Sequence, residues 1–216
     1  MRLFAAVWPT EDVLDHLDDA LASVRAVGQS STLRWSARGT WHLTAAFYGE
    51  LPDGAVPALT DELATAVGGL APFSLLLRGA GLFSHRTLWV GVGGAVDAQR
   101  RLASACGAAG EAVGAWRDER PRERPHLTIG RVRPGSRPPR RYASPAGSTA
   151  PSGRRGGAGT GADDDAAAML VRAMSVYEGP SWLVDELQLV ESQPGAGRGG
   201  GPLYVPVERM RLGPTA

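Results

Sequence analysis

Two spacings of apolar residues recur along the chain, one typical of strands and one of helices. Short apolar runs bounded by Pro or Gly predict strands at residues 3–8, 33–35, 41–48, 73–77, 88–92, 126–132, 182–191 and 203–210. Apolar residues at helical spacing predict helices at residues 11–24, 56–67 and 95–116, with a short fourth helix that begins near Ala166. This order predicts an α+β fold with mainly antiparallel sheets.

The stretch from Pro134 to Ala168 breaks this pattern. Sixteen of its 35 residues are Gly, Pro or Ser, and large apolar side chains are almost absent. Such a segment cannot bury enough apolar surface to offset the entropy cost of ordering it. We therefore predict a disordered insertion over residues 134–165 within one domain that spans residues 1–216.

The composition restricts which classes of function the protein can have. All 23 basic residues are Arg, and the net charge of +1 means that nucleic-acid binding would need a local basic patch. The single cysteine, Cys106, allows neither an internal disulfide nor a cysteine-based metal cage, and we expect it to be buried. No apolar run is long enough for a signal peptide or a membrane span, so we expect a cytoplasmic protein without membrane contact.

One short motif occurs twice: His42-Leu43-Thr44 and His126-Leu127-Thr128. In a strand, the His and Thr of each copy lie on one face, and the Leu points to the other face. The copies are 84 residues apart in similar surroundings, so a duplicated fold would bring them together around a pseudo-twofold axis.

Two imidazoles and two hydroxyls suit the cleavage of a phosphodiester. A neutral His can take a proton from water while a charged His gives one to the leaving oxygen, and Thr hydroxyls can bind phosphate oxygens. This chemistry needs no metal, and no metal-binding motif is present. A single His-x-Thr is more often structural, but two matched copies favour function. We expect His16 on a helix surface, and His85 in a turn where it can at most contact substrate.

With these motifs, the sequence resembles the 2H phosphoesterase superfamily and, within it, the RNA 2',3'-cyclic phosphodiesterases, also called 2'-5' RNA ligases. The resemblance covers most of the chain and rests on Met1-Arg2-Leu3-Phe4-Ala5-Ala6, Leu33-Arg34-Trp35, Phe47 and Gly49 after the first motif, Arg124-Pro125 and Arg131 around the second, and Val184-Asp185-Glu186-Leu187 to Ser192. It implies a bilobal fold, with two pseudo-symmetric antiparallel sheets that flank a central groove and helices outside.

The resemblance also implies roles for individual residues. His42 would be the general acid for the leaving O3', and His126 the general base for water. Thr44 and Thr128 would bind the phosphate. Arg131 would contact phosphate or nucleobase, and Phe47 would offer a stacking surface.

Phe47 and Arg131 are each five residues past their His, which in a regular strand is the opposite face. Either the strand ends or bulges there, or these side chains reach around its edge. The alternative is Phe47 in the core and Arg131 as surface charge. The Arg excess around the second motif, nine Arg against three acids over residues 117–141, would attract an RNA backbone, although a solvated loop is also consistent with it.

The leading hypothesis is therefore metal-independent, cofactor-free hydrolysis of RNA 2',3'-cyclic phosphate ends to 2'-phosphates, with reversible 2'-5' ligation as a further activity. We expect a monomer whose partner is RNA with such an end, tRNA fragments among them, or a related nucleotide. The alternatives are a 2H phosphoesterase for another small cyclic nucleotide or a 2'-5' oligonucleotide, and a non-catalytic RNA-binding module.

Overall fold

The computed structural model describes residues 1–27, 33–116, 124–133 and 162–213. Its four helices are α1 (Glu11–Val27), α2 (Val56–Gly68), α3 (Val96–Ala112) and α4 (Ala162–Ala173). Its strands are β1 (Arg2–Val7), β2 (Leu33–Trp35), β3 (Leu43–Glu50), β4 (Phe73–Phe83), β5 (Thr87–Gly94), β6 (His126–Val132), β7 (Glu178–Val184), β8 (Glu186–Gln193) and β9 (Leu203–Arg211). The described residues thus have the α+β composition that the apolar pattern predicts.

The strands follow a nearly symmetric order, β7-β4-β5-β6-β3-β1-β8-β9, with β2 added beside β6. All pairs are antiparallel. The centre of this order is the β3–β6 contact, where Leu43 pairs with Leu127 and which joins the two halves of the sheet. The two expected sheets are therefore present as two halves of one hydrogen-bonded order, and the two His-Leu-Thr motifs lie at their junction.

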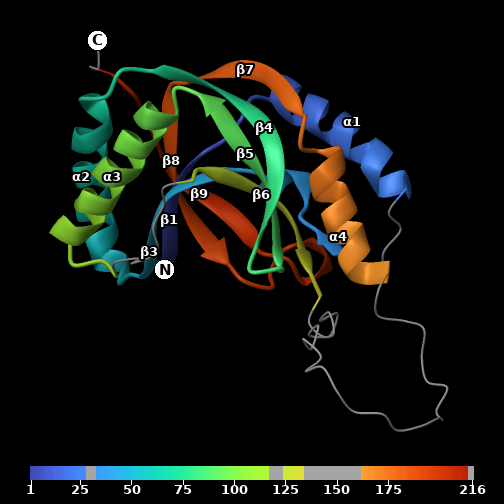
Figure 1. Cartoon of the computed structure of the whole chain (residues 1–216). Helices are drawn as coiled ribbons and strands as arrows, with labels where there is room; N and C mark the ends of the chain where they lie inside the picture. The colour runs from blue at the N-terminus through green and yellow to red at the C-terminus, as the bar shows by residue number, and fades with distance from the viewer. Residues whose placement is uncertain (28–32, 117–123, 134–161, 214–216) are drawn as a thin grey trace, which may run out of the picture.

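Helices cover the outer face of each half (Figure 1). Helices α2 and α3 pack together, α3 against β3 and α2 against β9, whereas α1 packs against β7 and α4 against β4. In α2, Leu59, Leu63 and Val67 lie on one face and are buried. Because the helices cover the apolar face of each half, polar groups can lie on the opposite face of the sheet.

Two predicted boundaries are wrong. The single strand expected over residues 182–191 is two strands, β7 and β8, separated at Asp185. β7 pairs with β4 in one half, and β8 pairs with β1 in the other. The chain crosses between the halves at Asp185, which an uninterrupted apolar pattern does not show.

The fourth helix begins at Ala162, before the predicted start near Ala166, in a segment where repeated Ala favours helix. The predicted insertion therefore ends sooner than residue 165, and its remaining part, residues 134–161, lies outside the described residues. None of the helices in the described ranges combines the length and apolar character needed to cross a bilayer.

Candidate active site

The pairing of Leu43 with Leu127 fixes how the two motifs face each other. In an antiparallel register centred on this pair, His42 is opposite Thr128 and Thr44 is opposite His126. Both leucines are fully buried, so the four polar side chains share the other face of the sheet. Cross-strand neighbours lie about 4.5–5.5 Å apart at Cβ, which brings two imidazoles and two hydroxyls into one site.

Matching bulges decide where Phe47 and Arg131 lie. On β3, Thr44 pairs with Ala6 and Ala46 with Ala5, so Ala45 is the extra residue. On β6, Thr128 pairs with Trp89 and Gly130 with Leu88, so Ile129 is the extra residue. Each bulge reverses the alternation of side chains beyond it.

The side chains after the bulges consequently lie on the face of the sheet that carries the histidines and threonines of the two motifs, which we call the site face. Phe47 stacks on Phe4 at 5.6 Å between ring centroids, and Phe4 packs on His42 at 5.0 Å. Burial raises the pKa of Tyr204, a second ring that contacts His42, and the positive charges of Arg131 and Arg2 oppose that shift. Among the explanations that the sequence leaves open for the positions of Phe47 and Arg131, the structure shows a bulge in each strand.

Main-chain hydrogen bonds orient both imidazoles in the same way. Nδ1–H of His42 donates to the carbonyl oxygen of Thr40 at 2.8 Å, and Nδ1–H of His126 donates to that of Arg124 at 2.9 Å. Because a carbonyl oxygen only accepts, each Nδ1 carries the proton. In neutral His42, Nε2 accepts a hydrogen bond from the Thr44 hydroxyl at 3.1 Å. The nitrogen suited to proton transfer is therefore Nε2 in each histidine.

Aromatic rings enclose His42. The ring centroids of Trp8, Phe4 and Tyr204 lie 4.9, 5.0 and 5.3 Å from that of its imidazole. Burial lowers the pKa of His42 from 6.5 to about 4, the bond to the Thr40 carbonyl opposes this shift, and the charge of His126 adds to it. His42 is therefore neutral at pH 7 in the free site, and the effect of His126 on it reflects how close the two imidazoles are.

Two rings also support His126. Phe83 meets its imidazole edge to face at 4.8 Å, and Trp89 lies 6.3 Å away and stacks on Phe83 at 4.9 Å. The indole of Trp89 lies over Gly81, where a Cβ atom would come within 2.2 Å of it. Gly81 thus leaves room for the Trp89 indole, which packs on Phe83 and His126.

Sequence reasoning missed these rings. Phe4 and Trp8 alternate in the first strand at the spacing that puts them on one face, a signal that could have found them. Tyr204, Phe83 and Trp89 reach the site only through strand pairing, and no local pattern identifies them.

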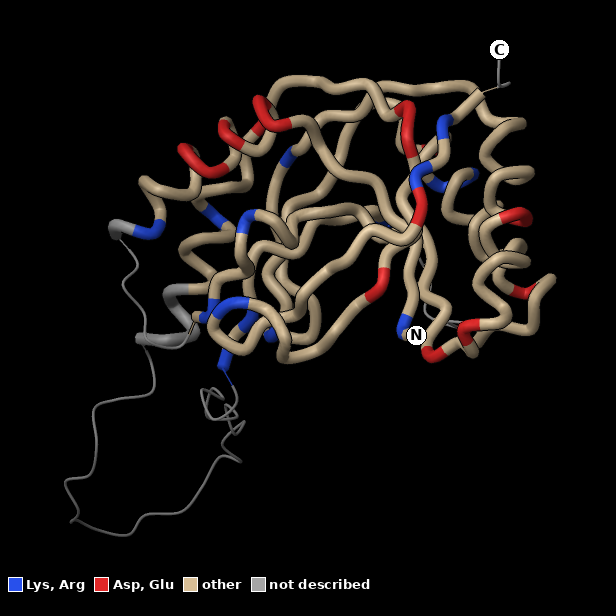
Figure 2. Tube along the Cα trace, turned by 180° about the vertical axis from the view of Figure 1, so that it is seen from behind, with Lys and Arg blue, Asp and Glu red and all other residues tan. Residues whose placement is uncertain are grey.

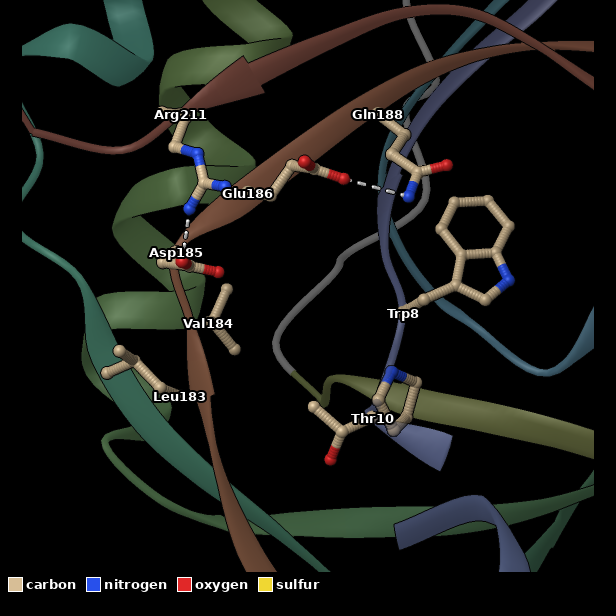
Figure 3. A pocket seen from close by; sticks show the side chains of 9 residues that line it. Trp8, Thr10, Leu183, Val184, Asp185, Glu186, Gln188 and Arg211 are labelled. Atoms are coloured by element: carbon tan, nitrogen blue, oxygen red, sulfur yellow. Dashed lines mark hydrogen bonds and ion pairs between the residues drawn. The ribbon is translucent and has the colours of Figure 1, made fainter. Parts of the chain in front are cut away.

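A cavity of about 200 Å³ adjoins the site at Trp8 (Figure 3). Asp185 binds Arg211 at 2.7 Å beside it, and the Gln188 amide donates to Glu186 at 3.1 Å. The remaining lining comes from Pro9, Thr10, Leu183 and Val184. Two carboxylates against one guanidinium make this cavity unfavourable for a phosphate group.

The other residues singled out in the sequence lie away from the imidazole pair or beneath it. His16 is exposed on α1, where its Nδ1 lies 3.1 Å from the Tyr177 hydroxyl. His85 is exposed in the β4–β5 hairpin, with a positive φ of 55°. Cys106 is fully buried, as expected, and so is Trp41, the residue before His42. Across the part of the chain that the structure describes, no three His, Cys, Asp or Glu side chains gather as a metal would need.

A comparison of the sequence with family models decides the family. The model of the 2'-5' RNA ligase superfamily matches residues 13–141, more than half of the chain, and includes both motifs. This chain belongs to the 2'-5' RNA ligase superfamily. The family that the paired motifs predict is thereby confirmed.

Curated members of the superfamily are similar over parts of the chain. An RNA 2',3'-cyclic phosphodiesterase of Methanothermobacter thermautotrophicus is 30% identical over 143 residues, which are 62% of this chain and 72% of that protein. One of Geobacillus stearothermophilus is 35% identical over 111 residues, 48% of this chain. The chain spans only about a third (34%) of the length of the Geobacillus protein.

Solved structures share the fold. The structure of TT0787 of Thermus thermophilus has a TM-score of 0.66 at 24% identity and covers 98% of both chains. Escherichia coli LigT, in complex with 3'-AMP, has a TM-score of 0.65 at 23% identity and covers 98% of this chain and 97% of that one. These likenesses confirm the α+β fold of the superfamily.

Proposed function

We propose that this superfamily member is a hydrolase that opens RNA 2',3'-cyclic phosphate ends to 2'-phosphates by acid–base catalysis with His42 and His126, without a metal ion. The observation that carries the proposal is the pair of imidazoles at the junction of the two sheet halves, both with Nδ1 bound to the main chain and Nε2 as the nitrogen suited to proton transfer. The names of the two curated relatives support the substrate.

The reaction needs one proton removed and one delivered. Nε2 of His126 takes a proton from water as its oxygen bonds to phosphorus, and the P–O3' bond breaks. Nε2–H of His42 gives a proton to O3', which leaves a 3'-hydroxyl and a 2'-phosphate. The hydroxyls of Thr44 and Thr128 and the guanidinium of Arg131 would hold the phosphoryl oxygens, on which charge grows in the transition state.

The proton on His42 must arrive with the substrate. In the free site burial lowers its pKa to about 4, so the imidazole is neutral near pH 7. A phosphodiester anion placed beside Nε2 favours the charged imidazolium and raises that pKa. Binding of the substrate anion thus charges the acid that the next step uses, while Phe4, Trp8 and Tyr204 keep water away from it.

Ligation follows from the same steps with a different nucleophile. If a 5'-hydroxyl of a second RNA replaces water, loss of O3' leaves the two chains joined by a 2'-5' bond. No nucleotide cofactor is consumed, because the energy comes from opening the strained ring. We propose this as a secondary activity of a monomeric, cytoplasmic protein, with tRNA fragments among its substrates.

An end-labelled oligoribonucleotide with a 2',3'-cyclic phosphate tests the proposal in the presence of EDTA. We expect conversion to the 2'-phosphate, identified by its resistance to a 3'-specific phosphatase, and near-complete loss of turnover in His42→Ala and in His126→Ala. His85→Ala, which removes an exposed imidazole, is the control and should keep full activity. Full activity in either of the first two variants would refute the mechanism.

A panel of substrates separates the alternatives. Turnover confined to small cyclic nucleotides or to 2'-5' oligonucleotides would identify a different 2H substrate. Binding of RNA without hydrolysis over a wide pH range would identify a binding module.

A further inference from the structure

Five exposed arginines lie near the end of β6: Arg34, Arg86, Arg131, Arg133 and Arg198. They come from four separate parts of the chain, and we refer to them as the arginine cluster. Figure 2 shows basic residues concentrated at this end, where β6 reaches its last described residues.

Pairing and hydrogen bonds bring these residues together. Arg131 pairs with Arg34 on β2 on one side and with Thr87 on β5 on the other. The guanidinium of Arg34 donates to the carbonyl oxygen of Gly199 at 3.0 Å, next to Arg198. The amide of Val132 donates to the carbonyl oxygen of Arg86 at 2.8 Å, which brings the β4–β5 hairpin beside Arg133.

The cluster lacks neutralising acids within the described ranges. Elsewhere arginines have carboxylate partners: Arg25 with Asp18, Arg38 with Glu11 and Asp15, Arg100 with Asp97, and Arg211 with Asp185. None of the five clustered arginines has an ion pair with a described acid. Like charges held close together without partners repel, and a polyanion would relieve that repulsion.

The cavity at Trp8, with Asp185 and Glu186 against Arg211, lies at the other end of the strands from the arginine cluster. β8 begins at the cavity with Glu186 and ends before the turn that contains Arg198. β4 likewise runs from Phe73, paired with Val184 of the cavity, to the hairpin with Arg86. The carboxylates of the cavity and the arginine cluster are thus separated by the length of these strands.

We infer that the arginine cluster binds the phosphates of the RNA chain upstream of the cyclic end, so that the substrate is an RNA strand of several nucleotides that leaves the site past this cluster. The inference rests on the proposed function and adds the substrate length and the direction of the strand. Arg131 belongs both to the candidate active site and to the arginine cluster, because it lies on the site face and also pairs with Arg34.

The inference predicts how rate depends on length and salt. Each phosphate contact on a single strand contributes about 0.7 to the slope of log affinity against log salt, or about 2.6-fold between about 50 and about 200 mM salt. We expect kcat/KM to rise steeply from a nucleoside 2',3'-cyclic phosphate to an oligoribonucleotide of about eight residues with the same end. The gain should shrink as salt increases.

Matched double variants test which arginines are responsible. Arg133→Gln with Arg198→Gln removes two exposed arginines of the cluster, and we expect the salt slope for the long substrate to fall by about 1.4. Arg101→Gln with Arg172→Gln removes two exposed arginines of helices α3 and α4 and should leave the slope unchanged. The Arg101/Arg172 double variant should hydrolyse both substrates at the wild-type rate, whereas the Arg133/Arg198 double variant should lose more kcat/KM on the long substrate than on the nucleoside cyclic phosphate.

The outcomes separate this inference from the proposed function. Equal kcat/KM for short and long substrates, or equal slopes in the two double variants, would overturn the inference while the hydrolase proposal stands. If no substrate is hydrolysed, the proposed function fails, and fluorescence anisotropy with a labelled RNA that ends in a 2'-phosphate tests the cluster alone. Displacement of that RNA by polyglutamate as readily as by unlabelled RNA would point to an acidic protein partner instead and overturn the choice of RNA.

Discussion

The enclosed imidazole of His42 should make the protein less stable as pH falls. Its pKa is about 4 in the folded protein against 6.5 ordinarily, so between these values the unfolded chain binds a proton that the folded chain does not. Stability therefore rises with pH across this window and falls as pH decreases through it. The full difference, about 2.5 pKa units, corresponds to about 3 kcal/mol, of which about 2.5 kcal/mol is already lost at pH 4.5.

Replacing His42 with Gln removes this linkage. We expect urea unfolding at about pH 7 and about pH 4.5 to show that the wild type loses about 2.5 kcal/mol more than His42→Gln over that interval. His85→Gln is the matched control, because it removes an exposed imidazole from a hairpin, and it should follow the wild type. Titration of the His42 ring protons by NMR measures the same pKa directly.

One result would refute the reasoning about burial. If wild type and His42→Gln lose the same free energy between the two pH values, the rings of Phe4, Trp8 and Tyr204 do not keep His42 neutral. The charging of His42 by bound phosphodiester would then have no basis, since the imidazole would already be partly charged in the free site.

Two further predictions concern packing and the acid–base roles. Gly81→Ala should destabilise the protein by about 1–3 kcal/mol and lower kcat/KM, because its Cβ would displace Trp89, which lies beside His126. Gly107→Ala lies in a helix with open space around it and should stabilise the protein by about 0.5–1 kcal/mol. Equal changes in stability on thermal unfolding of the two variants would contradict this prediction. A phosphodiester with a 4-nitrophenolate leaving group needs no acid, so it should restore turnover to His42→Ala but not to His126→Ala, and the reverse result would exchange the two roles.

The sequence alone determined the class of fold and the two motifs whose histidines we propose as the catalytic pair. His42, Thr44, His126 and Thr128 could be found because strand alternation is local: residues two apart share a face wherever the strand lies. The repeat of the motif implied that the two copies lie side by side, and the pairing of Leu43 with Leu127 confirms this. The burial of Trp41 and Cys106 was predictable for a similar local reason, since each is a residue type that usually lies inside.

The tertiary structure decided what surrounds that pair. Phe47 and Arg131 lie on the site face only because Ala45 and Ile129 are extra residues relative to the neighbouring strands, and a bulge is a property of the pairing of two strands. The break at Asp185 likewise depends on which strand lies next to each half of the segment.

The enclosure of His42 and the arginine cluster also required the folded chain. Tyr204 lies far along the chain from His42. Strand pairing joins residues 34 and 131, and hydrogen bonds from β2 and β6 to two turns bring residues 198 and 86 beside them. Contacts of this kind are long-range, whereas a sequence pattern reports on neighbours within one element. Short local motifs therefore set the chemical groups, whereas the fold sets the burial that lowers the pKa of His42 and brings the arginine cluster together.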